Sequence, residues 1–182
     1  MVKVVEVDAD AFLLESFLTK EECSLLITRT ENIGYSDAMI VSDGKQIAAR
    51  EIRNNKRVII DDENLAAEIW SKVRVYVPET LEGCKAIGLN ERFRFYRYEP
   101  KQMFRLHKDF PHKREGQESK LSIIIYLNDD FKGGETDFRK FKITPKAGSA
   151  FVFRHELLHE GCAVKSGKKY AVRTDIMYET SI

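Results

Sequence analysis

The stretch ERFRFYRY, residues 91–98, decides the fold class, because its side chains alternate in character along the chain. Phe93 and Phe95 fall on one face of an extended segment, whereas Arg94 and Tyr96 fall on the other. Alternation over this length is typical of a half-buried β-strand. The stretch therefore predicts a strand that is buried on one side only.

Similar segments fill the chain downstream of Gly83, where β-branched and aromatic runs are short and separated by turn residues. Residues 121–127 form an apolar run of strand length, residues 136–143 predict one or two strands, and residues 169–178 alternate again. About seven short strands at this spacing suggest a sandwich or a jelly roll. The predicted fold class is mainly β with flanking helices.

Two helices are predicted before this region. Thr19-Lys20-Glu21-Glu22 is a capping box, and it predicts a helix from about Lys20 to Glu31 that ends by Gly34. A second helix should run from Glu63 to about Val75, because its apolar residues recur on one face. Asp61 or Asp62 can cap it.

The length of 182 residues, with 43% hydrophobic and 32% charged residues, is that of one ordinary globular domain. We expect a single domain over residues 1–182, with helical support in 1–83 and a jelly-roll core in about 84–180. Residues 2–7 predict an N-terminal strand, and residues 42–44 predict a turn.

Charge and cysteine content exclude several classes of protein. The net charge of +1 gives no reason to expect nucleic acid or an anionic membrane as a partner. Cys23, Cys84 and Cys162 are widely spaced and odd in number, which fits a reducing compartment rather than a disulfide framework. The N-terminus lacks the features of a secretory signal, and no apolar run is long enough to span a membrane. We expect a cytoplasmic protein.

Arginine gathers in two parts of the chain, which are Arg92, Arg94, Arg97 and Arg105, and Arg50, Arg53 and Arg57. We interpret the first group as a solvated strand face, with an approach to an anionic co-substrate as the alternative. We interpret the second as a solvated loop, with a preference for an acidic substrate as the alternative. The polar loops at 36–57 and 113–119 do not identify the substrate.

His107 and Asp109 are the first candidates for chemistry. Side chains at i and i+2 of an extended segment share a face, and His159 from a neighbouring strand could complete the set. Two imidazoles and one carboxylate with open positions form the pattern of non-haem Fe(II) oxygenases. Alone, the His-x-Asp motif is a weak signal, and a hydrogen-bonded surface pair is the alternative.

A second motif overlaps the first. The sequence HELLH, residues 155–159, matches the zinc-protease signature, which requires a helix that brings both histidines to one face. The flanking residues 150–153 are strand-like, and this motif leaves His107 and Asp109 unexplained. We therefore favour the oxygenase.

Such an oxygenase usually takes two electrons from 2-oxoglutarate, whose distal carboxylate needs a buried cation. Lys169 lies ten residues after His159 at the start of an alternating strand and shares a face with Arg173 and Asp175. Lys169 is the first choice for this cation and Arg173 the second, and a surface position for Lys169 is the alternative.

Four motifs strengthen this hypothesis. They are YEPKQMF (98–104) before His107 and Asp109, YLND (126–129) with GGETDF (133–138), PKAGSA (145–150) with Phe153, and HEG (159–161) with Val164, Gly167, Lys169 and Tyr170. On these residues the region from about 93 to 178 resembles the prolyl 4-hydroxylase-like branch of the 2-oxoglutarate and Fe(II)-dependent oxygenases.

The resemblance implies a double-stranded β-helix, or jelly roll. It also implies site residues: iron held by His107, Asp109 and His159, and 2-oxoglutarate held by Lys169, Tyr126 and Thr136, with Tyr98 near the metal. Two departures concern the turn and the substrate. Lys101 stands where the family usually has glycine, and Arg173-Thr174-Asp175 replaces a tryptophan-containing pattern, which weakens any claim that the substrate is proline.

We therefore predict a dioxygenase that uses O2 and 2-oxoglutarate to hydroxylate an amino-acid side chain, in a peptide or free, and releases succinate and CO2. One alternative is a nucleic-acid dealkylating oxygenase, which would carry a second arginine beside Arg173. The other is a non-catalytic jelly-roll binding module, which would lack a metal ligand or the cofactor cation.

Overall fold

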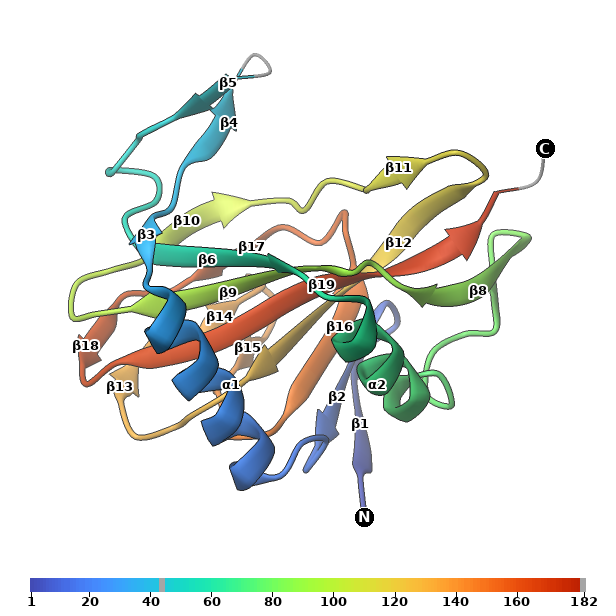
Figure 1. Ribbon diagram of the computed structural model, residues 1–182, viewed down its shortest axis with the longest axis horizontal. Helices are drawn as coiled ribbons and strands as arrows, with labels where there is room; N and C mark the ends of the chain where they lie inside the picture. Colours follow the sequence, from blue (N-terminus) through green and yellow to red (C-terminus); the bar gives the residue numbers. More distant parts are fainter. Residues whose placement is uncertain (43–44, 181–182) are drawn as a thin grey trace.

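The computed structural model describes residues 1–42 and 45–180, and within them nineteen strands and two helices are present. Most strands belong to one large antiparallel sheet, and a smaller four-stranded sheet faces it (Figure 1). Two facing sheets with flanking helices confirm the predicted mainly β, jelly-roll class. The turn predicted at residues 42–44 lies outside the described residues.

The large sheet has a main path of eight strands. Across the sheet these are β1 (Lys3–Asp8), β2 (Ala11–Glu15), β16 (Ala150–Arg154), β12 (Gln117–Tyr126), β19 (Lys169–Glu179), β9 (Arg92–Tyr98), β6 (Lys56–Asp61) and β3 (Ser36–Asp37). Three further strands belong to this sheet but lie off the path, namely β7 (Thr80–Leu81), β8 (Cys84–Leu89) and β11 (Lys113–Arg114). The predicted strands at residues 2–7 and 91–98 are therefore confirmed as β1 and β9.

The smaller sheet runs in the order β10 (Phe104–His107), β17 (His159–Gly161), β14 (Thr136–Asp137) and β15 (Lys142–Ile143). Two ribbons complete the strands, β13 (Lys132–Gly133) with β18 (Val164–Ser166) and β4 (Ile40–Ser42) with β5 (Lys45–Ile47). The prediction of one or two strands in 136–143 is confirmed by β14 and β15.

Both helices begin where their caps predict. In α1 (Lys20–Ile33) the Thr19 hydroxyl accepts a hydrogen bond from the Glu22 amide (3.1 Å), and the Glu22 carboxylate accepts one from the Thr19 amide (2.7 Å). In α2 (Glu63–Val73) the Asp62 carboxylate accepts a hydrogen bond from the Leu65 amide. Among the described residues no helix is long and apolar enough to cross a membrane.

The two helices cover the outer face of the large sheet (Figure 1). Phe93 and Phe95 of β9 point to this side and pack in one core with Val58 and Ile69. The opposite residues of β9 point between the two sheets. The strand β6, which the sequence did not predict, lies between the helices in the chain and pairs with β9, so the N-terminal part also contributes to the sheet.

Candidate active site

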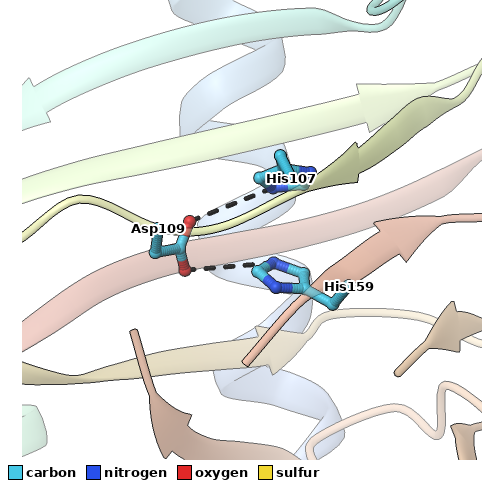
Figure 2. Close-up of side chains that lie close together, drawn as sticks. All are labelled: His107, Asp109 and His159. Atoms are coloured by element: carbon cyan, nitrogen blue, oxygen red, sulfur yellow. Dashed lines mark ion pairs between the residues drawn. The ribbon is translucent and has the colours of Figure 1, made fainter. Parts of the chain in front are cut away.

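His107, Asp109 and His159 meet between the two sheets (Figure 2). The antiparallel pairing of β10 and β17 sets His107 directly opposite His159, and Asp109 follows two residues after His107. Each histidine Nε2 lies 3.9 Å from a carboxylate oxygen of Asp109. The three donor atoms lie within 4.8 Å of one another. Strand pairing thus builds the cluster that the sequence suggested.

Hydrogen bonds to the backbone fix the tautomer of both histidines. Nδ1 of His107 lies 2.7 Å from the carbonyl oxygen of Arg105, and Nδ1 of His159 lies 2.8 Å from that of Leu157. A carbonyl oxygen only accepts, so each Nδ1 carries the proton and each Nε2 keeps a lone pair. Both lone pairs are available at the point that Asp109 faces.

Burial keeps this cluster in the protonation state that a metal ion requires. Burial and the neighbouring His159 lower the pKa of His107 to about 3, and burial also lowers the pKa of His159. Burial alone would raise the pKa of Asp109, but the charges of Arg173 and the histidines outweigh it and hold it at about 2. Two neutral imidazoles and one carboxylate fit Fe(II) with open positions.

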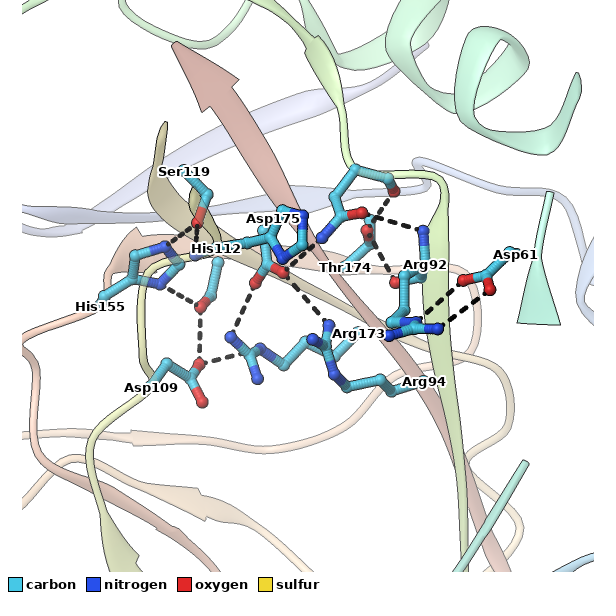
Figure 3. Close-up of polar contacts among 12 residues, drawn as sticks. Asp61, Arg92, Arg94, Asp109, His112, Ser119, His155, Arg173, Thr174 and Asp175 are labelled. Carbon is cyan, nitrogen blue, oxygen red and sulfur yellow. Dashed lines mark hydrogen bonds and ion pairs between the residues drawn. The ribbon is translucent and has the colours of Figure 1, made fainter. Parts of the chain in front are cut away.

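A buried polar network holds the carboxylate of Asp109 (Figure 3). Its Oδ2 accepts a hydrogen bond from the Ser122 hydroxyl (2.6 Å) and lies 3.0 Å from Nε of Arg173. Arg173 also pairs with Asp175 at 2.7 Å, and Asp175 contacts Arg94 at 3.2 Å. Because both contacts of Asp109 involve Oδ2, its Oδ1 remains free of side-chain hydrogen bonds among the described residues.

The zinc-protease interpretation of residues 155–159 is wrong for this fold. Residues 155–158 form a turn between β16 and β17, so no helix brings the two histidines to one face. The ring of His155 instead contacts the hydroxyls of Ser119 (2.9 Å) and Ser122 (2.8 Å), and its Ser122 contact joins it to the network behind Asp109. His155 supports the site from behind.

A cavity of about 420 Å³ opens beside the three residues, which is within the usual range for small-molecule sites. Lys169 lies in its wall and is only 3% exposed. Its Nζ donates to the Gly134 carbonyl at 2.6 Å, and no carboxylate of the described residues lies within ion-pair distance. Burial lowers the pKa of Lys169 to about 8. A buried cation without a counter-charge fits the distal carboxylate of 2-oxoglutarate.

The other residues predicted to bind the cofactor surround Lys169. The rings of Tyr98 and Tyr126 lie 5.2 and 5.4 Å from its Nζ. The hydroxyls of Tyr126 and Thr136 are 2.7 Å apart, and Thr136 lines the cavity. Arg173, the second choice for the carboxylate, lines the cavity too, but two carboxylates already neutralise it. The geometry therefore favours Lys169.

The interpretation of Arg53 as a residue of a solvated loop is wrong. Its side chain is 6% exposed, and its guanidinium lies over the rings of Phe104 (4.2 Å) and Tyr96 (5.0 Å). Phe104 in turn stacks on the ring of His107. Arg53 was missed because its role depends on packing between a loop and β10, which no periodicity reveals.

Three arginines of the first group lie on β9, and they divide between its two faces. Arg97 faces the helices and pairs with Glu31 of α1, whereas Arg92 lies on the same face as Arg94 and pairs with Asp61 of β6. Arg94 lines the cavity. The solvated-face interpretation therefore does not hold for Arg94.

Ser122 was also missed by the sequence analysis. Its only signal was that it is a single polar residue inside the apolar run at 121–127.

Comparison with known proteins agrees with this site. The family model of the 2OG-Fe(II) oxygenase superfamily matches residues 93–174, which include all three residues of the cluster. Over this region the chain matches the 2-oxoglutarate and Fe(II)-dependent oxygenases. Prolyl 4-hydroxylase 1 of Arabidopsis thaliana is 26% identical to this chain, over 93% of this chain and 69% of the relative.

Solved structures support the fold of the oxygenase. The viral collagen prolyl hydroxylase of Paramecium Bursaria Chlorella virus-1 superposes with a TM-score of 0.67 at 21% identity, covering 94% of this chain and 96% of the other. A prolyl hydroxylase from Trichoplax adhaerens, solved with a hypoxia inducible factor peptide fragment, gives 0.72 at 16% identity, covering 92% and 83%. These likenesses show that the fold is shared with prolyl hydroxylases, and the superfamily model that matches residues 93–174 is that of oxygenases that use Fe(II) and 2-oxoglutarate.

Proposed function

We propose that His107, Asp109 and His159 hold the iron, and that Lys169 holds the distal carboxylate of 2-oxoglutarate. The observation that carries this assignment is the shared cavity, because three metal donors and one buried cation without a carboxylate partner line the same space. Thr136 supplies a hydroxyl near the lysine, and Tyr98 and Tyr126 shield it from water.

When bound, the iron and 2-oxoglutarate supply oxidative hydroxylation by O2 with release of succinate and CO2. The residues of the chain provide the arrangement. The hydrogen bonds of the two Nδ1 atoms orient the imidazoles. Ser122 and Arg173 hold one oxygen of Asp109, which would leave the other available to bind the metal. Burial of Lys169 strengthens its attraction to a carboxylate.

The proposed substrate is an amino-acid side chain, in a peptide or free. This proposal is supported by the relatives, which are prolyl 4-hydroxylases, and by the open mouth of the cavity. Proline in a peptide is the first candidate to assay. Arg173 has no second arginine beside it on β19, so the structure offers no support for a dealkylase.

We further propose that residues 1–182 form one oxygenase domain and that it works in a reducing, cytoplasmic compartment, since the three cysteines are free.

The test is formation of succinate from 2-oxoglutarate with Fe(II) and O2, with and without prolyl peptides. The native protein should form succinate, and His107→Ala and Lys169→Ala should lose it, while Lys168→Ala, at the exposed neighbouring lysine, should retain it. Succinate formation that survives in His107→Ala, or its absence from the native protein under all conditions, would contradict the proposal.

A further inference from the structure

Three adjacent strands, β6, β9 and β19, form the wall of the cavity that faces His107, Asp109 and His159. The register pairs Tyr98 with Lys169, Tyr96 with Ala171 and Arg94 with Arg173 across β9 and β19. On the other side of β9, Arg57 of β6 pairs with Tyr96. Directly paired residues point to the same face. Lys169 therefore lies at one end of this wall, and arginines occupy the middle and the opposite end.

The charge in this cavity is strongly unbalanced. Six of its lining side chains are lysine or arginine and one is a carboxylate, and the members are Arg53, Arg57, Arg94, Lys108, Lys169, Arg173 and Asp109. Of these cations, Arg173 is neutralised by Asp109 and Asp175, and Lys169 is assigned to the cofactor. Of the other four, Lys108 is exposed. Arg53, Arg57 and Arg94 remain as a group in the middle of the wall and at the end away from Lys169, and we call these three the arginine cluster.

The guanidinium groups of the arginine cluster have few hydrogen-bond and ion-pair partners among the described residues. Arg53 is 94% buried, and its Nη2 has no hydrogen-bond partner among the described residues, although its Nε donates to Asn55. Arg57 is half-buried and forms no ion pair within the described part of the chain. Arg94 shares Asp175 with Arg173. The cluster therefore keeps more positive charge than its surroundings offset.

The three guanidinium groups also act on one another. Arg57 and Arg94 are diagonal neighbours on one face of paired strands, at a Cα separation of about 7–8 Å. Burial, with the nearby charges of Arg53 and Arg94, lowers the pKa of Arg57. Holding like charges together in a half-buried wall is unfavourable, and a bound anion would relieve it.

We infer that the arginine cluster binds a carboxylate of the substrate, so that the residue to be hydroxylated carries or adjoins an anionic group. This inference rests on the proposed function. Two sources share this chemistry: an aspartate or glutamate flanking the target residue in a peptide, and the α-carboxylate of a free amino acid. The planar guanidinium of arginine suits a carboxylate, because it donates two parallel hydrogen bonds.

The surroundings of the arginine cluster fit a substrate that approaches from outside. Met39, Ile52 and Phe110 line the same cavity and are exposed apolar side chains, with Phe110 82% exposed. Exposed apolar residues around a polar interior are typical of a binding mouth. The carboxylate would therefore enter past an apolar rim and reach the arginines, on the opposite side of the cavity from Lys169.

Binding is measured by calorimetry on the full chain loaded with Mn(II) and 2-oxoglutarate, so that no turnover is needed. The probes are two sets of twenty peptides, acetyl-Gly-Asp-Xaa-Asp-Gly-amide and acetyl-Gly-Asn-Xaa-Asn-Gly-amide, in which Xaa is each amino acid in turn. Free amino acids and their amides form a second pair of sets. We expect at least one acidic peptide or one free amino acid to bind about tenfold more tightly than its neutral counterpart.

The variants test which residues carry this preference. Arg57→Gln should reduce the preference to about threefold or less, Arg57→Lys should retain part of it, and Arg57→Glu should favour a matching set of lysine-flanked peptides. Arg50→Gln is the matched control, because Arg50 has the same charge and lies shortly before β6 in the chain, but it is exposed and paired with Asp37. It should leave the preference unchanged.

The outcomes separate this inference from the proposed reaction. Binding that depends on the carboxylate and on Arg57, without succinate formation under Fe(II) and O2, would leave the inference standing and contradict the reaction. Equal binding of the acidic and neutral sets, or no binding of either, would overturn the inference, even if succinate forms. A preference that survives in Arg57→Gln and Arg57→Glu would also overturn it.

Discussion

Arg173 lies between Asp109 and Asp175, and this position links the proposed metal site to the interior of the large sheet. Removing the guanidinium would leave Asp109 buried without its cation and raise its pKa. We predict that Arg173→Gln destabilises the protein by about 3 kcal/mol, because breaking one side of a buried ion pair leaves an uncompensated charge. It should also weaken metal binding about tenfold or more.

The measurements are urea unfolding and calorimetric titration with Mn(II) between pH 5 and 7. Because the pKa of Asp109 rises in the variant, metal binding should be lost at a higher pH than in the native protein. Arg92→Gln is the control, since Arg92 pairs with Asp61 at the surface and should cost less than about 1 kcal/mol. Equal metal affinity in Arg173→Gln and the native protein would refute this role.

Lys169 gives the site a pH dependence. Its pKa of about 8 means that the side chain is charged at neutral pH and loses its proton above pH 8. Only the charged form attracts a carboxylate, so 2-oxoglutarate affinity should be constant below pH 7 and fall by up to about tenfold per pH unit above 8. Dissociation constants at pH 7, 8 and 9 in the presence of Mn(II) test this.

Two variants distinguish Lys169 from other titrating groups. Lys169→Arg should bind more weakly but lose the fall above pH 8, because arginine stays charged. Lys168→Met, at the exposed neighbouring lysine, should keep the native profile. A native profile that is flat from pH 7 to pH 9 would show that Lys169 does not set the affinity.

At the level of elements, the turn between β9 and β10 has a specific weakness. Lys101 has a φ of 72°, in the left-handed region where glycine is favoured, and its amide donates to the Val164 carbonyl at 2.8 Å. The family that the sequence resembles usually has glycine at this position, and the sequence analysis identified Lys101 as a departure from it. We predict that Lys101→Gly stabilises the protein by about 1 kcal/mol.

Thermal unfolding provides the measurement for this turn. Lys140→Gly is the control, because Lys140 is exposed and does not have a positive φ, so glycine there should destabilise slightly through a more flexible unfolded chain. If Lys101→Gly lowers the unfolding temperature as much as the control does, the backbone at this turn is not strained.

Helix caps and alternating side chains are short-range signals, and they correctly predicted the elements that carry them. The capping box at Thr19 and the cap at Asp62 set the starts of α1 and α2, and the alternation of residues 91–98 correctly gave β9 its two faces. The strand β6 was missed because its short KRVIID run lacks clear alternation and is recognised only by its pairing with β9. Pairing partners are not encoded locally.

The candidate site follows the same rule. The His107 and Asp109 pair was visible because i and i+2 residues share a face, and the motifs around them pointed to His159 and Lys169. The burial of Arg53 and the contacts of Ser122 with Asp109 and of His155 with Ser122 were not predictable, because they arise from the packing of segments that lie far apart in the sequence.

At the level of the whole molecule, the cofactors should stabilise the fold, because they bind groups whose partners the chain does not supply. A ligand at 100 times its dissociation constant contributes about 2.7 kcal/mol. We predict that Mn(II) with 2-oxoglutarate raises the unfolding temperature by several degrees, that Mn(II) alone raises it less, and that Lys169→Ala abolishes the additional effect of 2-oxoglutarate. An additional effect that persists in Lys169→Ala would contradict this.

The proposed iron ligands are His107, Asp109 and His159. The most direct measurement is anaerobic titration of Fe(II) into the native protein, His107→Ala and His155→Ala, with circular dichroism to verify that each is folded. The account predicts one tightly bound iron per chain in the native protein, at least about 100-fold weaker binding in His107→Ala, and a much smaller loss in His155→Ala. Iron binding that is intact in His107→Ala but abolished in His155→Ala would contradict it.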